Sequence, residues 1–198
     1  MDRGLVILLH GVGSNGANMA ALGRALAPAL PSFVFESPDA PGGSGPRREW
    51  FSVIGVTEVN RPERVVAARP GFDAVIANLI EQHGFSNAVD RVVLLGFSQG
   101  SIMALDALAS GRWPVGAVVA FSGRLASPAP LVPATGTPLL LIHGGADPVM
   151  PSSESVRAAE LLTAAGVHAR TSIEPGLGHQ VSNTGLAEVA RFLNEVLS

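Results

Sequence analysis

Short apolar runs recur along the chain, and most of them lack the polar alternation of a half-exposed strand. These runs cover residues 5–10, 32–37, 91–98, 116–123, 138–144 and 169–175. Segments with helical spacing of apolar residues lie between them, at residues 17–30, 72–83, 99–110, 153–165 and 184–197. Unbroken apolar runs are typical of strands that are buried on both faces of a parallel sheet. The alternation therefore predicts an α/β fold with a mostly parallel, doubly wound sheet, whose functional loops follow the carboxyl ends of the strands.

One region, residues 38–71, interrupts this alternation. A small apolar cluster lies in its middle: Trp50, Phe51, Val53, Ile54 and Val56. A connection of this length inside a compact domain is commonly a lid or a binding loop. The alternative is an inserted loop whose apolar residues fold under themselves. At this chain length we expect a single domain over residues 1–198, with a lid or pocket loop at about 38–71.

Composition excludes several classes of protein and site. Apolar residues make up 47% of the chain and charged residues only 15%, which excludes a disordered chain. The net charge is −3 and no basic run is present, so we expect no nucleic-acid partner. The chain has no Cys, which excludes disulfides, thiol nucleophiles and thiolate metal sites. Its five His residues show no metal-ligand spacing, so we expect no metal site.

The first apolar run bears on the cellular compartment. It begins at Leu5 and ends in the turn formed by His10 and Gly11, which makes it too short for a secretory signal or a membrane span. We therefore expect a cytoplasmic protein without stable membrane insertion.

The sequence GFSQG, residues 96–100, stands where an apolar run meets a helical segment. This G-x-S-x-G pattern is typical of a nucleophile on a strained strand-to-helix turn, where only small neighbouring residues let the helix approach the strand. On such a turn the Ser98 hydroxyl is exposed at the sheet edge, and the Gln99 backbone N–H faces the developing oxyanion. The alternative is a chance match in a chain with 23 Gly, but chance rarely supplies the strand before and the helix after. Ser98 is therefore the candidate nucleophile.

A serine nucleophile needs a general base, and the base needs an acid that orients it. In hydrolases with this type of turn, the acid and then the histidine follow the serine along the chain. Asp147 directly follows an apolar run, and His179 lies between the next run and the last helical segment. Both residues occur in the required order, which predicts Asp147 as the orienting acid and His179 as the base.

Other acidic and histidine residues have weaker claims to these roles. Glu174, at the end of a predicted strand, is the best substitute acid. Asp106 falls inside the helical segment after the turn at Ser98, where we expect it to face solvent. His143 lies within an apolar run, where it fills the core or bonds to the loop that follows. The remaining candidates, His83 and His168, are expected to be exposed.

The segment LLHGVGSNG near the start of the chain supports two interpretations. Gly11, Gly13 and Gly16 match the dinucleotide-binding fingerprint, and Glu36 lies at the sequence distance of a ribose ligand. The same glycines suit an H-G-type loop that supplies a second oxyanion donor from the Val12 N–H. The dinucleotide interpretation leaves the serine, aspartate and histidine of the later loops unexplained, so the hydrolase interpretation is preferred.

Together these motifs resemble those of the carboxylesterase/phospholipase family of α/β hydrolases, which includes the acyl-protein thioesterases. The similar segments are, in order, LLHGVGSNGANM, REWFSVIGV, VVLLGFSQGSIMALDAL, LLLIHGGADPVMP and GLGHQVS. The resemblance covers nearly the whole chain and implies a minimal, single-domain α/β-hydrolase fold. It also implies a catalytic triad that needs no metal or organic cofactor.

The resemblance implies further site residues. The oxyanion hole of the family falls on the backbone amides of Val12 and Gln99. Its acyl pocket falls on the segment WFSVIGV, with Trp50, Ile54 and Val56 as candidate lining.

Three departures from the thioesterase pattern bear on the substrate, and one is that the loop after WF is rich in Arg instead of acidic. Ser14 stands where those proteins usually carry Asp, and Ser101 stands where their elbow usually continues with Gly. We therefore expect a carboxylesterase that acts on small esters with short to medium acyl chains, with an acyl-protein thioesterase or a lysophospholipase as alternatives. A dinucleotide-dependent oxidoreductase and a non-catalytic binding module are the rival classes. The apolar residues of the lid suit a pocket or a homodimer contact equally well.

Overall fold

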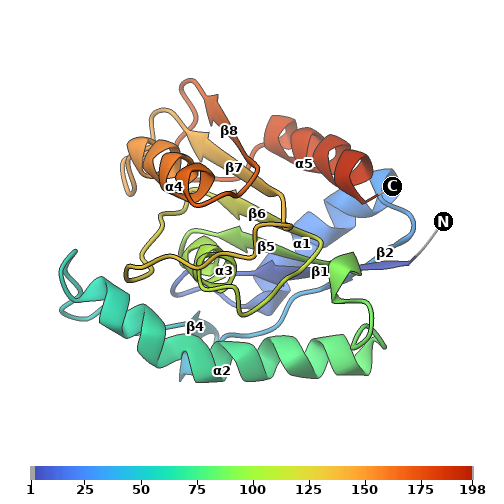
Figure 1. Cartoon of the computed structure of the whole chain (residues 1–198), viewed down its shortest axis with the longest axis horizontal. Helices are drawn as coiled ribbons and strands as arrows, with labels where there is room; N and C mark the ends of the chain where they lie inside the picture. Colours follow the sequence, from blue (N-terminus) through green and yellow to red (C-terminus); the bar gives the residue numbers. More distant parts are fainter. Residues whose placement is uncertain (1–2, 198) are drawn as a thin grey trace.

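The computed structural model describes residues 3–197 and contains one six-stranded sheet, one two-stranded hairpin and helices on both faces of the larger sheet (Figure 1). The strands are β1 (Gly4–Leu9), β2 (Phe33–Glu36), β3 (Gly42–Ser44), β4 (Arg47–Glu49), β5 (Val92–Phe97), β6 (Ala117–Phe121), β7 (Leu139–Gly144) and β8 (Ala169–Glu174). The α-helices are α1 (Gly16–Leu26), α2 (Arg61–Gln82), α3 (Gln99–Ala109), α4 (Ser153–Ala164) and α5 (Asn183–Val196). Two single-turn 3-10 helices, η1 (Ala27–Ala29) and η2 (Val89–Arg91), precede β2 and β5.

The six strands pair in the order β2-β1-β5-β6-β7-β8, and every pair is parallel. Ile7 of β1 stands opposite Leu94 of β5, and Leu95 of β5 stands opposite Val119 of β6. The chain forms β2 on one side of β1 and then crosses to the other side to form β5. Ligands bind at such a reversal, beyond the carboxyl ends of the strands, so the loops after β1 and β5 are the expected site. The predicted α/β, doubly wound parallel sheet is confirmed.

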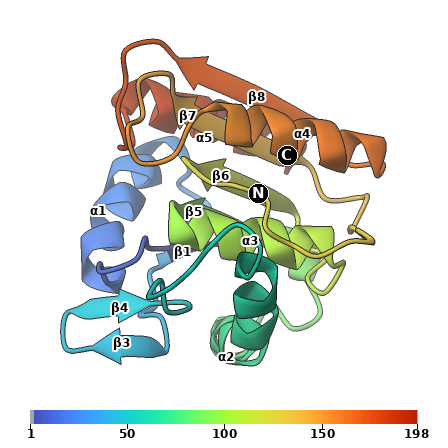
Figure 2. The same ribbon diagram turned by 90° about the vertical axis from the view of Figure 1, so that its left-hand side faces the viewer.

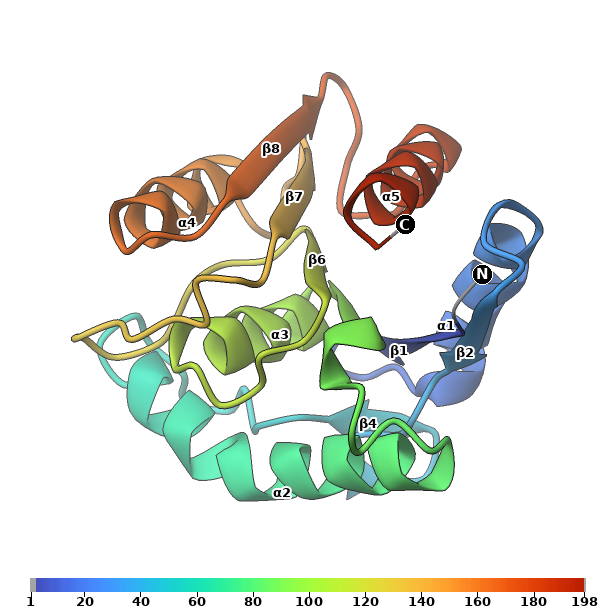
Figure 3. The same cartoon turned by 45° about the vertical axis from the view of Figure 1, so that its right-hand side comes forward.

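Successive side chains of the strands enter two separate cores, one on each face of the sheet. Leu5, Ile7 and Leu9 of β1 pack in the core formed with α2, α3 and α4. Val6 and Leu8 pack in the core formed with α1 and α5. Figure 1 and Figure 3 show these two helix layers on opposite faces of the sheet. Because both faces are covered, the central strands are mainly apolar, whereas the edge strand β8 is partly exposed.

Every residue of α3 is buried, because α2 and the segment after β6 cover the side of the helix that faces away from the sheet. The expectation that Asp106 faces solvent is therefore wrong. Its carboxylate accepts two hydrogen bonds from Arg69 of α2, at 2.9 and 2.8 Å. Arg112 and Ser127 donate to it at 2.9 and 2.7 Å. These partners come from other segments, so the local helical pattern gave no sign of them.

The prediction that residues 38–71 form one loop is wrong. They contain the β3–β4 hairpin and the first half of α2 (Figure 2). The helix begins at Arg61 and not near Phe72. Pro70 is the cause of this error, because an internal proline usually marks a helix boundary. The helix continues through Pro70 because the apolar side chains of Val65 and Phe72, on either side of it, are fully buried in the core.

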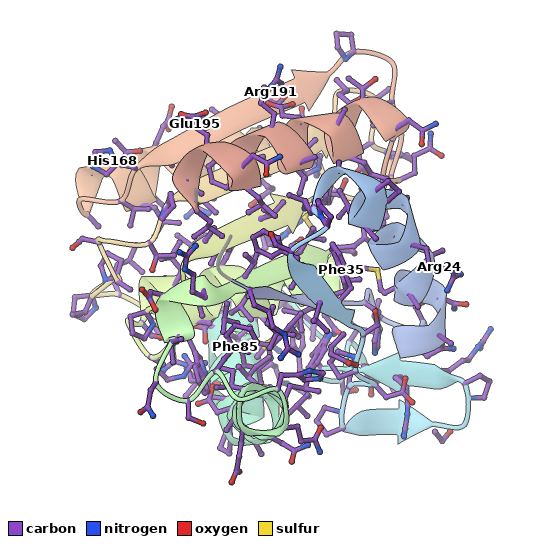
Figure 4. The ribbon with its side chains drawn as sticks, turned by 90° about the vertical axis from the view of Figure 1, so that its right-hand side faces the viewer. Arg24, Phe35, Phe85, His168, Arg191 and Glu195 are labelled. Carbon is purple, nitrogen blue, oxygen red and sulfur yellow. The ribbon has the colours of Figure 1, made fainter. Side chains whose placement is uncertain are left out.

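The last helix, α5, has the amphipathic character that its sequence predicts. Phe192 and Leu193 are buried against the sheet, whereas Arg191 and Glu195 lie on the outward face (Figure 4). His168, just before β8, is exposed as predicted. In the described part of the chain, no helix combines the length and the apolar character needed to cross a bilayer.

Candidate active site

Ser98 lies on the turn between β5 and α3, with φ 54° and ψ −114°, a conformation that L-residues rarely adopt. The glycines on either side permit this turn. A Cβ at Gly96 would lie 2.4 Å from the Ser101 nitrogen, and a Cβ at Gly100 would lie 2.1 Å from the Leu9 carbonyl oxygen. The helix therefore begins in direct contact with the strand ends and holds Ser98 at the carboxyl edge of the sheet. This is the strained strand-to-helix turn that a G-x-S-x-G sequence predicts.

The same edge of the sheet brings Ser98 to His179, in the loop between β8 and α5, and to Asp147, in the loop after β7. Ser98 Oγ lies 3.0 Å from His179 Nε2. His179 Nδ1 lies 2.6 Å from Asp147 Oδ2. The side chain of His179 is 16% exposed, whereas that of Asp147 is fully buried. The three residues thus form one hydrogen-bonded series, with the spacing of a nucleophile, a base and an orienting acid.

Hydrogen bonds keep the Asp147 carboxylate ionised. Its Oδ1 accepts from the backbone N–H groups of Val149 and Met150, at 2.8 and 2.9 Å. Burial opposes ionisation, but these bonds and the one to His179 outweigh it and lower the pKa of Asp147 below its ordinary value. The negative charge holds a proton on Nδ1 of His179 and leaves Nε2 free to accept the Ser98 proton.

A second histidine, His143, lies buried behind Asp147. Its Nε2 is 2.9 Å from the Met150 carbonyl oxygen, and its Nδ1 is 2.7 Å from Ser155 Oγ. Because a carbonyl oxygen only accepts, Nε2 carries the proton and Ser155 donates to Nδ1. The same Nε2 lies 3.3 Å from Asp147 Oδ2. His143 therefore bonds to the loop that carries Asp147, as predicted.

Glu174, the substitute acid, has a different position and partner. Both of its carboxylate oxygens lie within 2.7 Å of the Ser182 hydroxyl. Ser182 in turn caps α5 by accepting a hydrogen bond from the Gly185 N–H. Glu174 therefore stabilises the start of α5, whereas Asp147 is the carboxylate that bonds to Nδ1 of His179.

The loop after β1 lies directly against Ser98, since a Cβ at Gly11 would be 3.2 Å from Ser98 Cβ. The backbone N–H groups of Val12 and Gln99 have no hydrogen-bond acceptor among residues 3–197. The Gln99 N–H belongs to the first turn of α3, where a helix leaves its donors unpaired and favours negative charge. Two such donors flanking a nucleophile are the arrangement that stabilises an oxyanion.

Buried polar contacts fix the position of this loop. His10 Nε2 accepts from the Ala40 N–H at 3.0 Å, and Nδ1 donates to the Gly11 carbonyl at 2.8 Å. Burial lowers the pKa of His10, so the neutral ring and both bonds persist at neutral pH. The His10 carbonyl also accepts from the Trp50 indole N–H at 3.0 Å.

The Gln99 side chain has a role that the sequence did not reveal. Its Oε1 accepts from the Trp50 N–H at 2.8 Å, and its Nε2 donates to the Phe51 carbonyl at 2.7 Å. The side chain thus bonds to the main chain of two successive residues and ties the segment before α2 to the nucleophile turn. The only sequence signal for this contact is the amide itself, since its partners depend on the path of a distant segment.

The structure contradicts the dinucleotide-binding alternative. The Gly16 N–H, at the start of α1 where a pyrophosphate would bind, donates to Asp39 Oδ1 at 2.8 Å. A Cβ at Gly16 would lie 1.9 Å from the Ser37 carbonyl oxygen, so the chain after β2 packs directly against this glycine. Glu36 lies 3.0 Å from His83 Nε2, and His83 is partly buried, not exposed as predicted. Within residues 3–197, no three His, Asp or Glu side chains are grouped as metal ligands are.

The three residues expected to line an acyl pocket lie in different environments. Trp50 is 4% exposed, packs edge-on against Phe72 and contributes to a hollow of about 310 Å³ that Arg64 also lines. Val56 is partly buried, but Ile54 is 82% exposed and forms no part of an enclosed wall. Contact of these three residues with a substrate stays a prediction.

Comparison with known proteins gives a consistent grouping. The sequence profile described as phospholipase/carboxylesterase matches residues 1–197. The chain is 38% identical over 184 residues to esterase YpfH of Escherichia coli (strain K12), covering 92% of this chain and 78% of that protein. It is 27% identical over 215 residues to acyl-protein thioesterase 1 of Neurospora crassa, covering 97% and 86%. The solved structure of esterase PE8 matches with a TM-score of 0.86 and 35% identity, over 98% of this chain and 93% of that one, which confirms the α/β-hydrolase fold.

Proposed function

This chain belongs to the phospholipase/carboxylesterase family of α/β hydrolases and is an enzyme of the carboxylesterase type; on that premise we propose that Ser98 is the nucleophile that cleaves carboxylic esters with short to medium acyl chains. His179 is the general base and Asp147 is the acid that orients it. The observation that carries the proposal is the unbroken series of contacts, 3.0 Å from Ser98 to His179 and 2.6 Å onward to Asp147.

The first half of the reaction transfers the acyl group to the enzyme. Ser98 Oγ forms a bond to the ester carbonyl carbon while its proton moves to His179 Nε2. The bond from that carbon to the alcohol oxygen then breaks, and the alcohol leaves with the proton from Nε2. The Asp147 carboxylate stabilises the imidazolium that forms in between.

The second half returns the enzyme to its starting state. Water attacks the acyl carbon as its proton moves to His179 Nε2. The carbon–Oγ bond breaks, the acid leaves, and Ser98 regains its proton from Nε2. In both halves the Val12 and Gln99 N–H groups stabilise the tetrahedral oxyanion, each by about 3 kcal/mol.

The test is hydrolysis of p-nitrophenyl esters from acetate to palmitate by the wild type and by Ser98→Ala. We expect turnover over one range of chain lengths and no turnover above background in the variant. Ser98→Ala removes one buried oxygen and is expected to remain folded, which circular dichroism and a melting curve check. Equal hydrolysis by both proteins, or covalent labelling by a phosphonate at a residue other than Ser98, would refute the assignment.

A second candidate is hydrolysis of thioesters, which is favoured by the similarity to a protein named acyl-protein thioesterase 1. The same Ser98 chemistry cleaves a thioester, with a thiol in place of the alcohol as the leaving group. Matched oxygen and sulfur esters of one acyl chain distinguish the two candidates. A kcat/KM at least about tenfold higher for the sulfur ester, roughly 1.4 kcal/mol, would favour the thioesterase.

A further inference from the structure

A cavity of about 360 Å³ is lined by none of the residues of the proposed catalytic series. Three arginines line it: Arg61, Arg124 and Arg157. The carboxylates of Glu58 and Glu154 line it as well, so guanidinium groups outnumber carboxylates. The chain has a net charge of −3 and its cations are otherwise scattered, which makes this a local exception.

The cavity is lined by segments that adjoin the loops of the proposed active site: the starts of α2 and α4 and the segment after β6. Arg124 follows β6, whose last residue, Phe121, accepts a hydrogen bond from the Ser98 N–H at 2.9 Å. Three residues of chain, at most about 10 Å, separate Phe121 from Arg124. Glu154 stands in the first turn of α4, just after the loop that carries the orienting acid. Arg61 is the first residue of α2. The chain that leads from β4 to α2 is the one to which the Gln99 side chain bonds at Trp50, and Figure 2 shows its path.

The Arg124 guanidinium is largely buried, and its donors are not fully used. Its side chain is 13% exposed, and its buried Nε has no hydrogen-bond partner in the described structure. The Glu154 carboxylate lies 3.9 Å from Arg124 Nη1. That separation is about 1 Å longer than a charge-assisted N–H···O bond. A buried guanidinium with open donors is unfavourable alone and is stabilised by an anion that enters the cavity.

Arg61 lines the same cavity, and the charge of Arg124 affects its pKa. Burial and the positive field of Arg124 lower the pKa of Arg61, although Glu58 and Glu154 oppose this effect. Two guanidinium groups therefore lie close enough to repel each other. An anion between them would relieve that repulsion.

The backbone around Arg124 is held rigidly. A Cβ at Gly123 would lie 2.4 Å from Ser101 Cβ, so the chain leaves β6 in contact with the first turn of α3. Ser127 Oγ donates to the buried Asp106 carboxylate at 2.7 Å. Between these two anchors, Leu125 and Ala126 are buried and give the cavity an apolar floor. A site held in this way loses little conformational entropy when a ligand binds.

We propose that this arginine cavity binds a carboxylate or phosphate group carried by the substrate, so that the enzyme prefers esters with an anionic group remote from the scissile bond. The planar guanidinium of Arg124 or Arg61 matches the paired oxygens of either group. The inference rests on the proposed esterase function, because the cavity is offered as part of the same substrate site.

The kinetic test compares two esters of the same length, mono-p-nitrophenyl glutarate and p-nitrophenyl pentanoate. The wild type is expected to have the higher kcat/KM for the anionic ester. In Arg124→Gln and Arg61→Gln the anionic-to-neutral ratio should fall at least about tenfold, with turnover of the neutral ester unchanged. Monoesters from glutarate to suberate then measure the distance from Ser98 to the cavity, as the chain length with the highest ratio.

Two further variants make this test specific. Arg124→Lys keeps the charge but not the planar fork, and is expected to keep part of the preference. Arg24→Gln removes an exposed arginine from the outward face of α1, on the other side of the sheet (Figure 4), and is expected to leave the ratio unchanged. An equal ratio in the wild type, Arg124→Gln and Arg61→Gln would overturn the proposal.

A binding measurement separates failure of this inference from failure of the esterase proposal. Glutarate and inorganic phosphate are added separately to Ser98→Ala protein, and the melting temperature is followed. Stabilisation that is lost when Arg124→Gln is combined with Ser98→Ala supports the anion site even if no ester is hydrolysed. The ligand with the larger shift identifies the anion as a carboxylate or a phosphate. No stabilisation by either ligand, or the same shift in both proteins, overturns the anion site.

Discussion

Two aspartates, Asp147 and Asp106, both have buried side chains and do different things. Both side chains are fully buried, and in both cases hydrogen bonds outweigh the effect of burial and lower the pKa. Asp106 is paired with Arg69 and Arg112, which stay charged at all relevant pH values. Asp147 is paired with His179, whose proton can move. Burial and a lowered pKa therefore do not separate a catalytic carboxylate from a structural one, whereas the partner does.

The contacts around the two carboxylates also differ: those of Asp106 are structural, whereas those of Asp147 lead to the candidate nucleophile. The contacts of Asp106 connect α2, α3 and the segment after β6, so they hold covering layers together. The contacts of Asp147 lead outward, through His179 to Ser98 at the edge of the sheet. We expect substitution of Asp106 to change the free energy of unfolding, and substitution of Asp147 to change the rate of reaction.

The largest expected effect is on the activity of Asp147→Asn. We expect kcat to fall about 10⁴-fold, because an amide no longer holds the proton on Nδ1 of His179 or stabilises the imidazolium. Initial rates with the best p-nitrophenyl ester measure this loss, and the melting temperature should change little. Glu174→Gln serves as the control and should keep wild-type kcat. Full activity of Asp147→Asn together with a loss of kcat in Glu174→Gln would mean that Glu174, and not Asp147, orients His179.

The reverse result is expected for Asp106→Asn. Removing this charge leaves Arg69 and Arg112 without their buried partner, which typically costs about 3–5 kcal/mol of folding stability. Urea unfolding measures the loss, and kcat of the folded fraction should stay within about twofold of wild type, a difference of roughly 0.4 kcal/mol in barrier. A fully stable but inactive Asp106→Asn would break the distinction between the two aspartates.

Acid pH gives an independent measure of the Asp106 contribution. Its pKa is lower in the folded state, so the stabilisation is fully present above the ordinary carboxyl pKa, about 3.9, and is lost as the pH falls toward the folded-state value. The stability difference between wild type and Asp106→Asn should be constant from about pH 5 to 7. Below about pH 4 it should shrink by up to about 1.4 kcal/mol per pH unit. A difference that stays constant down to pH 3, in unfolding curves taken at each pH, would contradict this account.

The sequence predicted those parts of the molecule that depend on local chemistry. The predicted runs identified all six strands of the main sheet, most clearly the central ones, because strands covered on both faces need mainly apolar side chains. Gly96 and Gly100 marked the turn at Ser98, because only glycine allows the contacts seen there. Asp147 and His179 were singled out by the hydrolase order of serine, acid and histidine, and each follows a strand whose carboxyl end lies at the same edge as that of β5.

The features that the sequence did not predict depend on contacts between distant segments. The start of α2 was obscured by Pro70, a local signal that the burial of Val65 and Phe72 overrides. The burial of Asp106 depends on its pairing with Arg69, which is 37 residues away in the sequence, so the local pattern could not reveal it. The β3–β4 hairpin contains few apolar residues and is positioned by backbone bonds with the loop after β1, such as that from the Gly13 N–H to Arg48.

The smallest expected effect comes from a third carboxylate, Asp73, which shares Arg112 with Asp106. Its side chain is 32% exposed, and it accepts from Arg112 and from the Trp113 indole N–H, at 3.0 and 2.7 Å. In Asp73→Asn the amide oxygen still accepts from Trp113, while the change removes the charge and the second oxygen that accepts from Arg112 Nε. Because solvent screens an exposed ion pair, the free energy of unfolding should fall by only about 0–1 kcal/mol. Urea unfolding of Asp73→Asn and Asp106→Asn, measured side by side, tests whether burial determines how much stability a carboxylate gains from pairing with Arg112. Equal losses in the two variants would mean that Arg112 and not burial decides it.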